Sequence, residues 1–178
     1  MTYEELFGLL RDRRSIRYFQ DKPIDTVTLD SILAAAVLAP SVENTQPWHF
    51  QVIQNPEFKE KMMQCSCYGN FVSGAATFIV ISCDKSAKGA QQSTIWNPRE
   101  MEYSCAVAMH NMMLAATTLG IGTCWVSLHH GPSHNLLKLA DHHVVIGGLM
   151  LGYMKDAEQT PSGEHERKPL ETAVTYYA

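Results

Sequence analysis

Apolar residues recur at helical spacing in two stretches near the amino terminus. Leucines repeat along one face of residues 3–11, behind a capping box formed by Thr2 and Glu5, so a first helix should end near Arg11. A second apolar repeat covers residues 28–39 and stops at Pro40, which cannot continue a helix. The chain therefore begins with two predicted helices.

Shorter apolar runs farther along predict strands. The segments with strand patterns are residues 49–54, 77–82, 123–127 and 144–153. Residues 77–82 form a continuous apolar, β-branched run typical of a central strand. Between these runs, Asn55-Pro56 should open a helix that frays near residue 68, and a short helix is expected around residues 133–140. The fold class is therefore α+β, a mixed sheet flanked by helices.

The longest predicted helix begins at Pro98 and carries no charged residue between Tyr103 and Leu119. A helix that is apolar on nearly every face must be buried all round, so we expect a core helix that also packs against a second copy in a homodimer. The residues expected at that interface are Cys105, Ala106, Met109, Met112, Met113 and Ala116. Residues 173–177 have strand composition but no obvious place in the sheet, and we expect them to reach across to the other subunit.

Composition narrows the class of protein. The 178 residues, 46% hydrophobic and 18% charged, indicate a single globular domain over residues 1–178. The net charge of −4 gives no overall positive field for nucleic acid or a membrane surface, so neither is expected as a partner. The amino terminus lacks the apolar core of a signal peptide, and the odd number of cysteines, five, indicates reduced thiols; both favour the cytoplasm.

Arginines and small polar residues gather at three places that could recognise a phosphate: residues 13–17, the loop 40–48 and residues 167–170. Taken singly, each has a simpler interpretation. The first could be the solvated end of a helix, the second a plain helix-to-strand connection, and the third an exposed basic patch.

Taken in order, these segments resemble the nitroreductase family. They are Arg13-Arg14-Ser15-Ile16-Arg17, then Ala39-Pro40-Ser41 through Asn44-Thr45-Gln46-Pro47-Trp48-His49-Phe50, and Arg167-Lys168-Pro169-Leu170-Glu171. Supporting matches are Leu119-Gly120-Ile121-Gly122-Thr123-Cys124-Trp125 and the strand that ends at Leu151-Gly152-Tyr153. The resemblance spans nearly the whole chain.

The resemblance implies an FMN cofactor held between the two subunits. Its phosphate would be bound by Arg13, Ser15, Arg17 and Arg167, with help from Arg14 and Lys168. The partner chain would contribute Pro40, Ser41, Val42 and Asn44, and the flavin would also contact Asn70, Val126, Ser127 and Leu128. Relatives often carry glycine at positions 127 and 128, so this chain should have a narrower pocket above the ring.

The activity that the resemblance implies is a ping-pong reaction. NADH or NADPH would bind transiently as the reductant, and a nitroaromatic, quinone or similar small molecule would accept the electrons. The sequence carries no nucleophile and base motif and no dinucleotide fingerprint, which agrees with chemistry supplied by a cofactor. Loops over the scaffold should line the substrate pocket, with Tyr68, Phe71 and Trp96 as its expected residues.

Two alternatives remain open from the sequence. A flavin-dependent dehydrogenase or dehalogenase acting on one metabolite would fit the same resemblance. A non-catalytic flavin or ligand carrier would follow if Leu128 and its neighbours blocked the pocket.

Histidines also crowd into one stretch: His129, His130, His134, His142 and His143. The Gly131-Pro132 pair should interrupt a helix there, and no carboxylate or thiolate arrangement completes a ligand set. We therefore expect no metal site. The roles of His129 and His130, which adjoin the expected flavin contact, are left open.

Overall fold

The computed structural model describes residues 1–68, 74–87, 97, 99–155 and 166–177. In chain order its elements are α1 Tyr3–Asp12, α2 Thr26–Val37, η1 Val42–Asn44, β1 Trp48–Ile53, α3 Pro56–Met63, β2 Thr77–Asp84, α4 Arg99–Thr118, β3 Ile121–Val126, α5 His130–Leu137, β4 His143–Tyr153 and η3 Leu170–Thr172. The predicted α+β class is confirmed.

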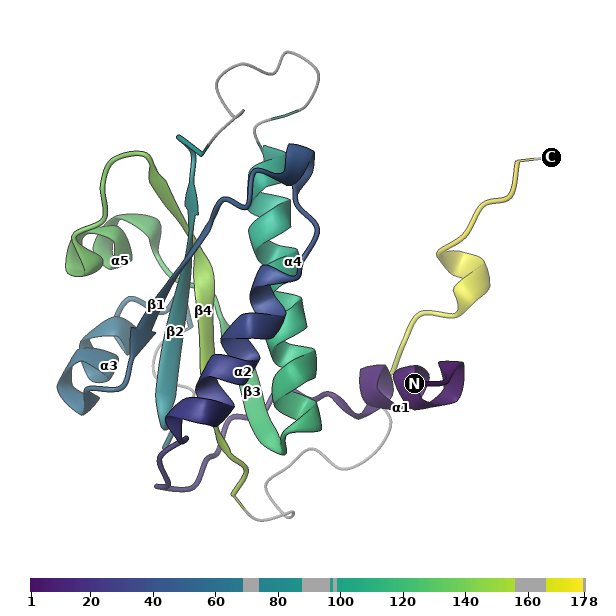
Figure 1. Cartoon of the computed structure of the whole chain (residues 1–178), viewed down its shortest axis with the longest axis horizontal. Coiled ribbons are helices and arrows are strands. Elements are labelled where there is room, and N and C mark those ends of the chain that lie inside the picture. Colours follow the sequence, from purple (N-terminus) through teal and green to yellow (C-terminus); the bar gives the residue numbers. More distant parts are fainter. Residues whose placement is uncertain (69–73, 88–96, 98, 156–165, 178) are drawn as a thin grey trace.

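A four-stranded antiparallel sheet in the order β1-β2-β4-β3 forms the centre of the fold. Helices α2 and α4 cover one face, and α3 and α5 lie on the other (Figure 1). Strand β2 is buried from Thr77 to Cys83, as its continuous apolar run predicted. Each sheet face therefore has its own apolar core, one beneath α2 and α4 and one beneath α3 and α5.

Side-chain caps explain where several helices begin. Thr2 and Glu5 form the predicted capping box at α1, with a 2.7 Å bond from Thr2 N to Glu5 Oε2. Helix α3 begins at Pro56 behind Asn55, as expected. Helix α2 begins two residues earlier than predicted, because Asp25 Oδ1 accepts the Thr28 N–H at 2.9 Å and caps it there.

The prediction for α5 was wrong at its start. The helix begins at His130 and includes Gly131 and Pro132. A proline in the first turn costs no intrahelical hydrogen bond, because the N–H groups of that turn have no partner within the helix. His130 and His134 consequently line the same pocket, one turn apart.

The expected interface residues of α4 also need correction. Cys105, Met109, Met112, Met113 and Ala116 are buried in the chain's own core against α2 and the sheet, and Ala106 is half-buried. The exposed face of α4 instead carries Tyr103, Val107 and His110. An apolar pattern alone does not distinguish residues of a chain's own core from residues of a subunit interface.

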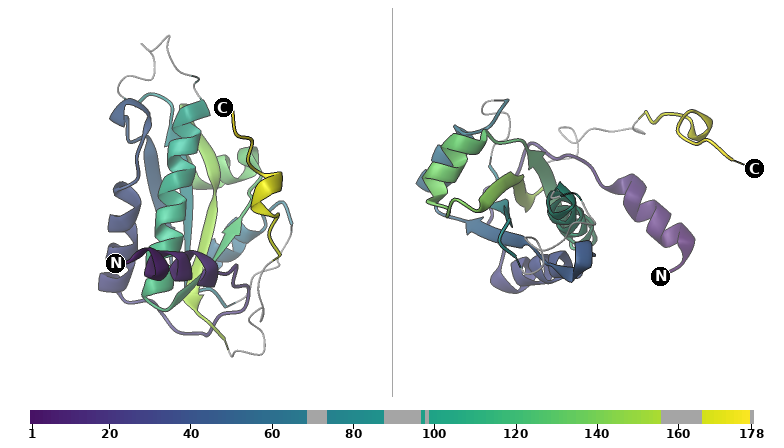
Figure 2. Two further views of the ribbon diagram at one scale, coloured as in Figure 1. Left: turned by 90° about the vertical axis from the view of Figure 1, so that its right-hand side faces the viewer. Right: turned by 90° about the horizontal axis from the view of Figure 1, so that it is seen from above.

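Two segments project away from the sheet (Figures 1 and 2). Helix α1 has no buried residue, and Phe7 is 54% exposed. The tail forms the short helix η3 rather than a strand, and Tyr176 and Tyr177 are 87% and 93% exposed. Within one chain, residues 173–177 join no strand of the described sheet.

All five cysteines are unpaired, in agreement with the expected reduced thiols. None of the helices in the described ranges combines the length and apolar character needed to cross a lipid bilayer.

Candidate functional site

The first predicted phosphate-binding segment runs along strand β3. After α1 ends, Ser15 pairs in parallel with Thr123, and Ile16 N donates to Thr123 O at 2.8 Å. Ile16 is buried in the core. Neighbours on either side of an inward-facing residue in an extended segment point outward, so Ser15 and Arg17 are directed away from the core. The buried isoleucine thereby fixes the orientation of the polar residues around it.

Arginines from both ends of the chain meet beside this segment. Burial, followed by the charges of Arg167 and Arg14, lowers the pKa of the Arg13 guanidinium. Arg167 of the carboxyl-terminal segment is thus near enough to Arg13 for its charge to act on that guanidinium. Arg14 Nη1 also donates to Arg11 O at 2.7 Å, which orients that side chain. The planar donors of guanidinium groups are suited to bidentate binding of a phosphate.

A cavity of about 210 Å³ at the end of α4 is lined by Arg14 and also by Asp12. Its lining includes Arg14, Thr117 and Gly120. The cationic segment and the end of α4 therefore bound one concave region at the base of the sheet.

The expected flavin contact after β3 is hydrogen-bonded to residues 65–67, which follow α3. Ser127 O accepts the Cys67 N–H at 2.9 Å, and His129 N donates to Cys65 O at 2.8 Å. Ser127 is exposed, whereas Leu128 is buried in the core beneath α3 and α5. The Leu128 side chain packs into that core, and the narrower pocket above the ring stays a prediction.

The loop 40–46 holds the second motif in a strained conformation. Glu43, Asn44 and Gln46 have φ values of 45°, 54° and 48°, a region that side-chain-bearing residues seldom adopt. Gln46 N donates to Ser41 Oγ at 3.0 Å, and Val42 N donates to Ser104 Oγ at 3.2 Å. A hydrogen bond to Ser104 thus holds the strained loop onto the second turn of α4.

One chain does not bring these two motifs together. The loop is fixed at Ser104, whereas Arg14 and Thr117 share the cavity at the other end of α4. At about 1.5 Å per residue, Ser104 and Thr117 lie about 20 Å apart along the helix. The structure therefore gathers Arg13, Arg14 and Arg167 but leaves the loop remote.

The remaining predicted residues have varied positions. Lys168 and Pro40 are exposed, Val126 ends β3 in the core, and Tyr68 is exposed. Asn70, Phe71 and Trp96 lie outside the described residues.

The sequence analysis missed one cluster of side chains, formed by a carboxylate and two histidines. Asp84, at the end of β2, lies beside His142 and His143, so the argument that no carboxylate accompanies these histidines does not hold. Burial would raise the pKa of Asp84. Hydrogen bonds from Ser86 and the positive charge of the two neighbouring histidines outweigh burial and hold this pKa below its usual value. Burial lowers the pKa of His143, against the opposing effect of Asp84. The strand pairing that brings these residues together is not visible in a linear pattern.

Comparisons with known proteins agree with the arrangement of motifs. The model of the nitroreductase family matches residues 10–153. A protein from Archaeoglobus fulgidus, provisionally named an NADH dehydrogenase/NAD(P)H nitroreductase, is 34% identical, with 86% of this chain and 87% of that protein covered. A 5,6-dimethylbenzimidazole synthase from Rhodospirillum rubrum is 30% identical, with 69% of each chain covered.

A solved structure is also similar to this chain in fold and in sequence. It is a provisionally named nitroreductase from Desulfovibrio desulfuricans, in complex with FMN, with a TM-score of 0.77 and 26% identity over 99% of both chains. The match of the family model to most of the chain, together with these similarities in sequence and fold, shows that this chain belongs to the nitroreductase family.

Proposed function

We propose that this protein is an FMN-dependent oxidoreductase that uses NADH or NADPH to reduce nitroaromatic, quinone or similar small acceptors. The observation that carries this proposal is the position of Arg14 in the lining of the cavity at the end of α4, next to Arg13, on which the charge of Arg167 also acts. Three like charges repel one another, and a doubly charged phosphate would relieve that repulsion. The similarity to an FMN-bound structure supports the identity of the phosphate compound.

The residues present fit this cofactor. Arg13, Ser15, Arg17 and Arg167 would bind the phosphate, with Arg14 and Lys168 alongside. The backbone of residues 126–128 would lie beside the ring, where its bonds to residues 65–67 hold it in place. Bound FMN supplies two-electron transfer between a nicotinamide and an acceptor. The chain's own groups bind the cofactor, orient it and control access to it.

We further propose that the site forms only in a homodimer. The loop carrying Pro40, Ser41, Val42 and Asn44 lies about 20 Å along α4 from the arginines of its own chain. A partner packed on the exposed face of α4 could bring its own loop to those arginines. The uncovered helix α1 and the uncovered tail support such an assembly.

The substrate pocket would lie over the ring, near Tyr68, Phe71 and Trp96. One site would then serve both nicotinamide and acceptor, so the nicotinamide must leave before the acceptor binds. Ping-pong kinetics follow from this arrangement. We also propose a cytoplasmic location, with which the five unpaired cysteines agree.

A second candidate is a flavin enzyme dedicated to one metabolite. The similarity to 5,6-dimethylbenzimidazole synthase favours it, and slow turnover with generic nitro compounds and quinones would distinguish it. A non-catalytic flavin or ligand carrier is a third candidate, and reduction of the bound flavin by NADH or NADPH would rule it out.

The test begins with the visible spectrum of the purified protein. We expect flavin absorption, bleaching on anaerobic addition of NADH or NADPH, and parallel double-reciprocal lines when nicotinamide and acceptor are varied. A colourless protein that rejects added FMN would contradict the cofactor assignment. A yellow protein that neither nicotinamide reduces would contradict the proposed reductant, and intersecting lines would contradict the ping-pong order.

A further inference from the structure

Strand register collects ionisable side chains on one face of the sheet, at the end remote from the arginines. His49 of β1 pairs with Ser82 of β2, and Asp84 of β2 pairs with His143 of β4. Directly paired residues share a sheet face, as do residues two apart on one strand. His49, Asp84 and His143 therefore lie on the face that α3 and α5 cover.

The cluster is compact enough to bind a single ion. One ligand atom each from Asp84, His142 and His143 lies within 4.8 Å of the other two. His142 Nε2 is 3.7 Å from Asp84 Oδ1, and the two histidine rings are 4.8 Å apart between centroids. The His49 ring packs edge-on against His143, with the centroids 5.7 Å apart. Small shifts of these side chains would bring all three ligand atoms onto one metal ion.

Neighbouring side chains hold two of the three groups in place. His143 Nδ1 is 3.1 Å from Ser82 Oγ, which also accepts a hydrogen bond from Gln51 Nε2 at 2.9 Å. Such a contact at one ring nitrogen orients the imidazole and leaves Nε2 available as a ligand. Asp84 Oδ1 accepts hydrogen bonds from Ser86 N and Oγ at 2.8 and 2.7 Å, which orient the carboxylate beside His142.

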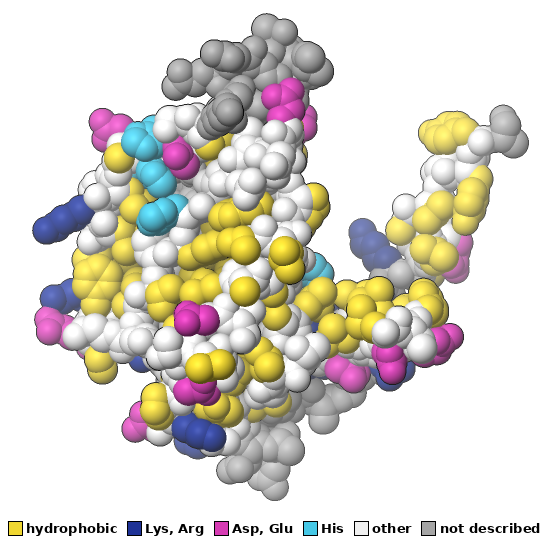
Figure 3. Space-filling model, viewed as in Figure 1, with side chains coloured by type: hydrophobic (Ala, Val, Ile, Leu, Met, Phe, Trp, Pro, Cys, Tyr) yellow, Lys and Arg dark blue, Asp and Glu magenta, His cyan; other side chains and the backbone are white. Residues whose placement is uncertain are grey.

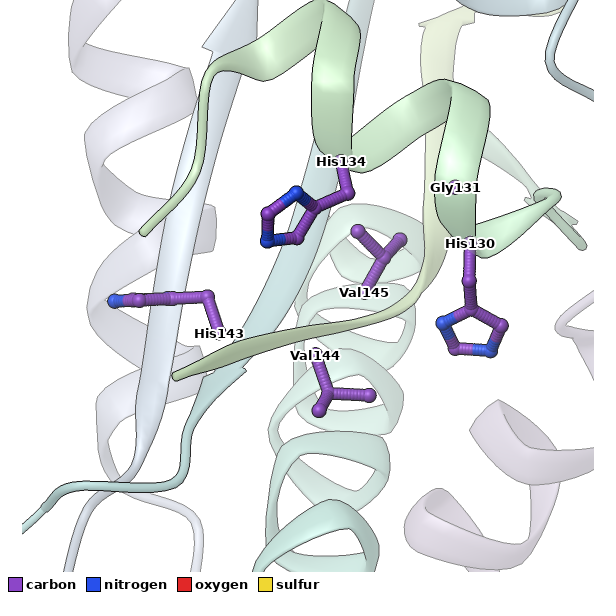
Figure 4. Close-up of a pocket in the computed structure, with 6 residues that line it drawn as sticks. All are labelled: His130, Gly131, His134, His143, Val144 and Val145. Atoms are coloured by element: carbon purple, nitrogen blue, oxygen red, sulfur yellow. The ribbon is translucent and has the colours of Figure 1, made fainter. Parts of the chain in front are cut away.

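The cluster is accessible to an ion. His143 borders a cavity of about 250 Å³ between α5 and the start of β4, opposite His134 and His130 (Figure 4). Histidine side chains gather beside acidic ones on the face of the molecule seen in Figure 3. His142 is 47% exposed and Asp84 33% exposed at the side chain. A metal could therefore enter from solvent and keep water molecules as further ligands.

We propose that Asp84, His142 and His143 form a binding site for one divalent transition-metal ion of the zinc type. Two imidazoles and one carboxylate suit Zn²⁺, whereas Mg²⁺ and Ca²⁺ prefer oxygen ligands alone. The metal would join the end of β2 to the start of β4.

The site is independent of the proposed flavin site. Ser15 pairs with Thr123, which pairs with Leu151 of β4. At about 3.3 Å per residue, Leu151 lies roughly 26 Å along the strand from His143. The expected ring contact is nearer: Val126 pairs with Gly148 of β4, which lies roughly 16 Å along the strand from His143. Loss of the metal should therefore leave flavin binding unchanged, and failure of the flavin proposal would not affect the metal site.

The test is calorimetric titration of Zn²⁺ into tag-free, chelator-treated full-length protein. We expect one ion per chain, with binding weakened more than about tenfold in Asp84→Asn, His142→Ala and His143→Ala. His130→Ala is the matched control: it removes a histidine from the same cavity but outside the ligand set, and it should bind Zn²⁺ as the wild type does. Ligand-field bands of Co²⁺ should follow the same ranking of variants.

Asp84→Asn keeps the size of the side chain and an oxygen for Ser86, so its fold should survive; far-UV circular dichroism and flavin content check this. Wild-type protein that takes up no Zn²⁺ when titrated to about 100 µM would overturn the proposal. Equal Zn²⁺ affinity in the wild type and the three ligand variants, or an equal loss in His130→Ala, would overturn the ligand assignment.

Discussion

Arg13 is half-buried among other guanidinium groups, and this explains why its pKa is lowered. Partial burial and repulsion by Arg167 and Arg14 both disfavour the charged form. Bound phosphate would reverse both effects by pairing the charge. At the scale of single residues, the proposed function therefore depends on charges that act on one another before a ligand arrives.

Removing one of these arginines should weaken FMN binding without unfolding the protein. Arg13→Ala or Arg17→Ala deletes a charge-assisted hydrogen bond of about 1.5–3 kcal/mol, which corresponds to roughly a 10- to 150-fold rise in Kd. Fluorescence titration of the apoprotein with FMN measures this Kd. Arg11→Ala is the control, because Arg11 is exposed and pairs with Asp12 at 3.6 Å. Wild-type affinity in both variants would mean that the cluster is only a solvated helix end.

Local motifs predicted some site residues better than others. The spacing of the arginines and serine pointed to a phosphate, and the structure brings Arg167 to Arg13. The burial of Leu128 was not predictable from the sequence, because Leu128 pairs with Ser66, and β2, α4 and β3 separate the two residues along the chain. Asp84 was missed for the same reason, since only the β2–β4 register puts it beside His143. Non-local pairing has no signature in a linear pattern.

Elements were predicted well where a cap or a proline marks the boundary. Helix α1 has its capping box, α3 begins at Pro56, and the buried run of β2 is a central strand. The predicted start of α5 was wrong, because the Gly131-Pro132 pair was interpreted as an interruption of the helix. The first turn of a helix tolerates such a pair. Local chemistry decides where an element begins, whereas tertiary packing decides which of its faces are covered.

The centre of the sheet should be intolerant of a single methyl group. A Cβ at Gly148 of β4 would lie 2.1 Å from Phe78 Cε2, and Phe78 is fully buried. Gly148→Ala must displace that ring, so we expect a loss of about 1–3 kcal/mol in the free energy of unfolding. Urea denaturation at fixed protein concentration measures this loss.

The matched control is Gly131→Ala in α5, where no atom of the described chain lies within 4 Å of the new Cβ. Its stability should stay within about 1 kcal/mol of the wild type, because alanine only improves helix propensity there. Equal urea midpoints for Gly148→Ala and the wild type would show that the strands do not approach as closely as described.

At the scale of the whole molecule, one chain leaves apolar surface uncovered. Helix α1 buries no residue, the tail tyrosines are almost fully exposed, and α4 presents Tyr103 and Val107 to solvent. Monomeric proteins seldom leave such surfaces open. A second copy would cover all three and would also supply the missing loop to the cationic cluster.

A charge on the exposed face of α4 should disrupt the dimer. Val107 is 39% exposed in the single chain, and Val107→Lys would bury an ammonium group in an apolar interface at a cost of several kcal/mol. Sedimentation velocity should then show monomers at micromolar concentration. Val27→Lys on α2, where the valine is 77% exposed, should remain dimeric. A dimeric Val107→Lys protein would place the interface elsewhere.

The shared flavin site is tested most directly by mixing two defective chains. One chain carries Arg13→Ala with Arg17→Ala, and the other carries Ser41→Ala with Asn44→Ala. If each site takes its arginines from one subunit and its loop from the other, the mixed dimer contains one intact site and one doubly defective site. Equilibrium dialysis of purified mixed dimers should find one tightly bound FMN per dimer, whereas each parental homodimer binds FMN weakly. Mixed dimers that bind FMN no better than their parents would contradict a site built from two subunits.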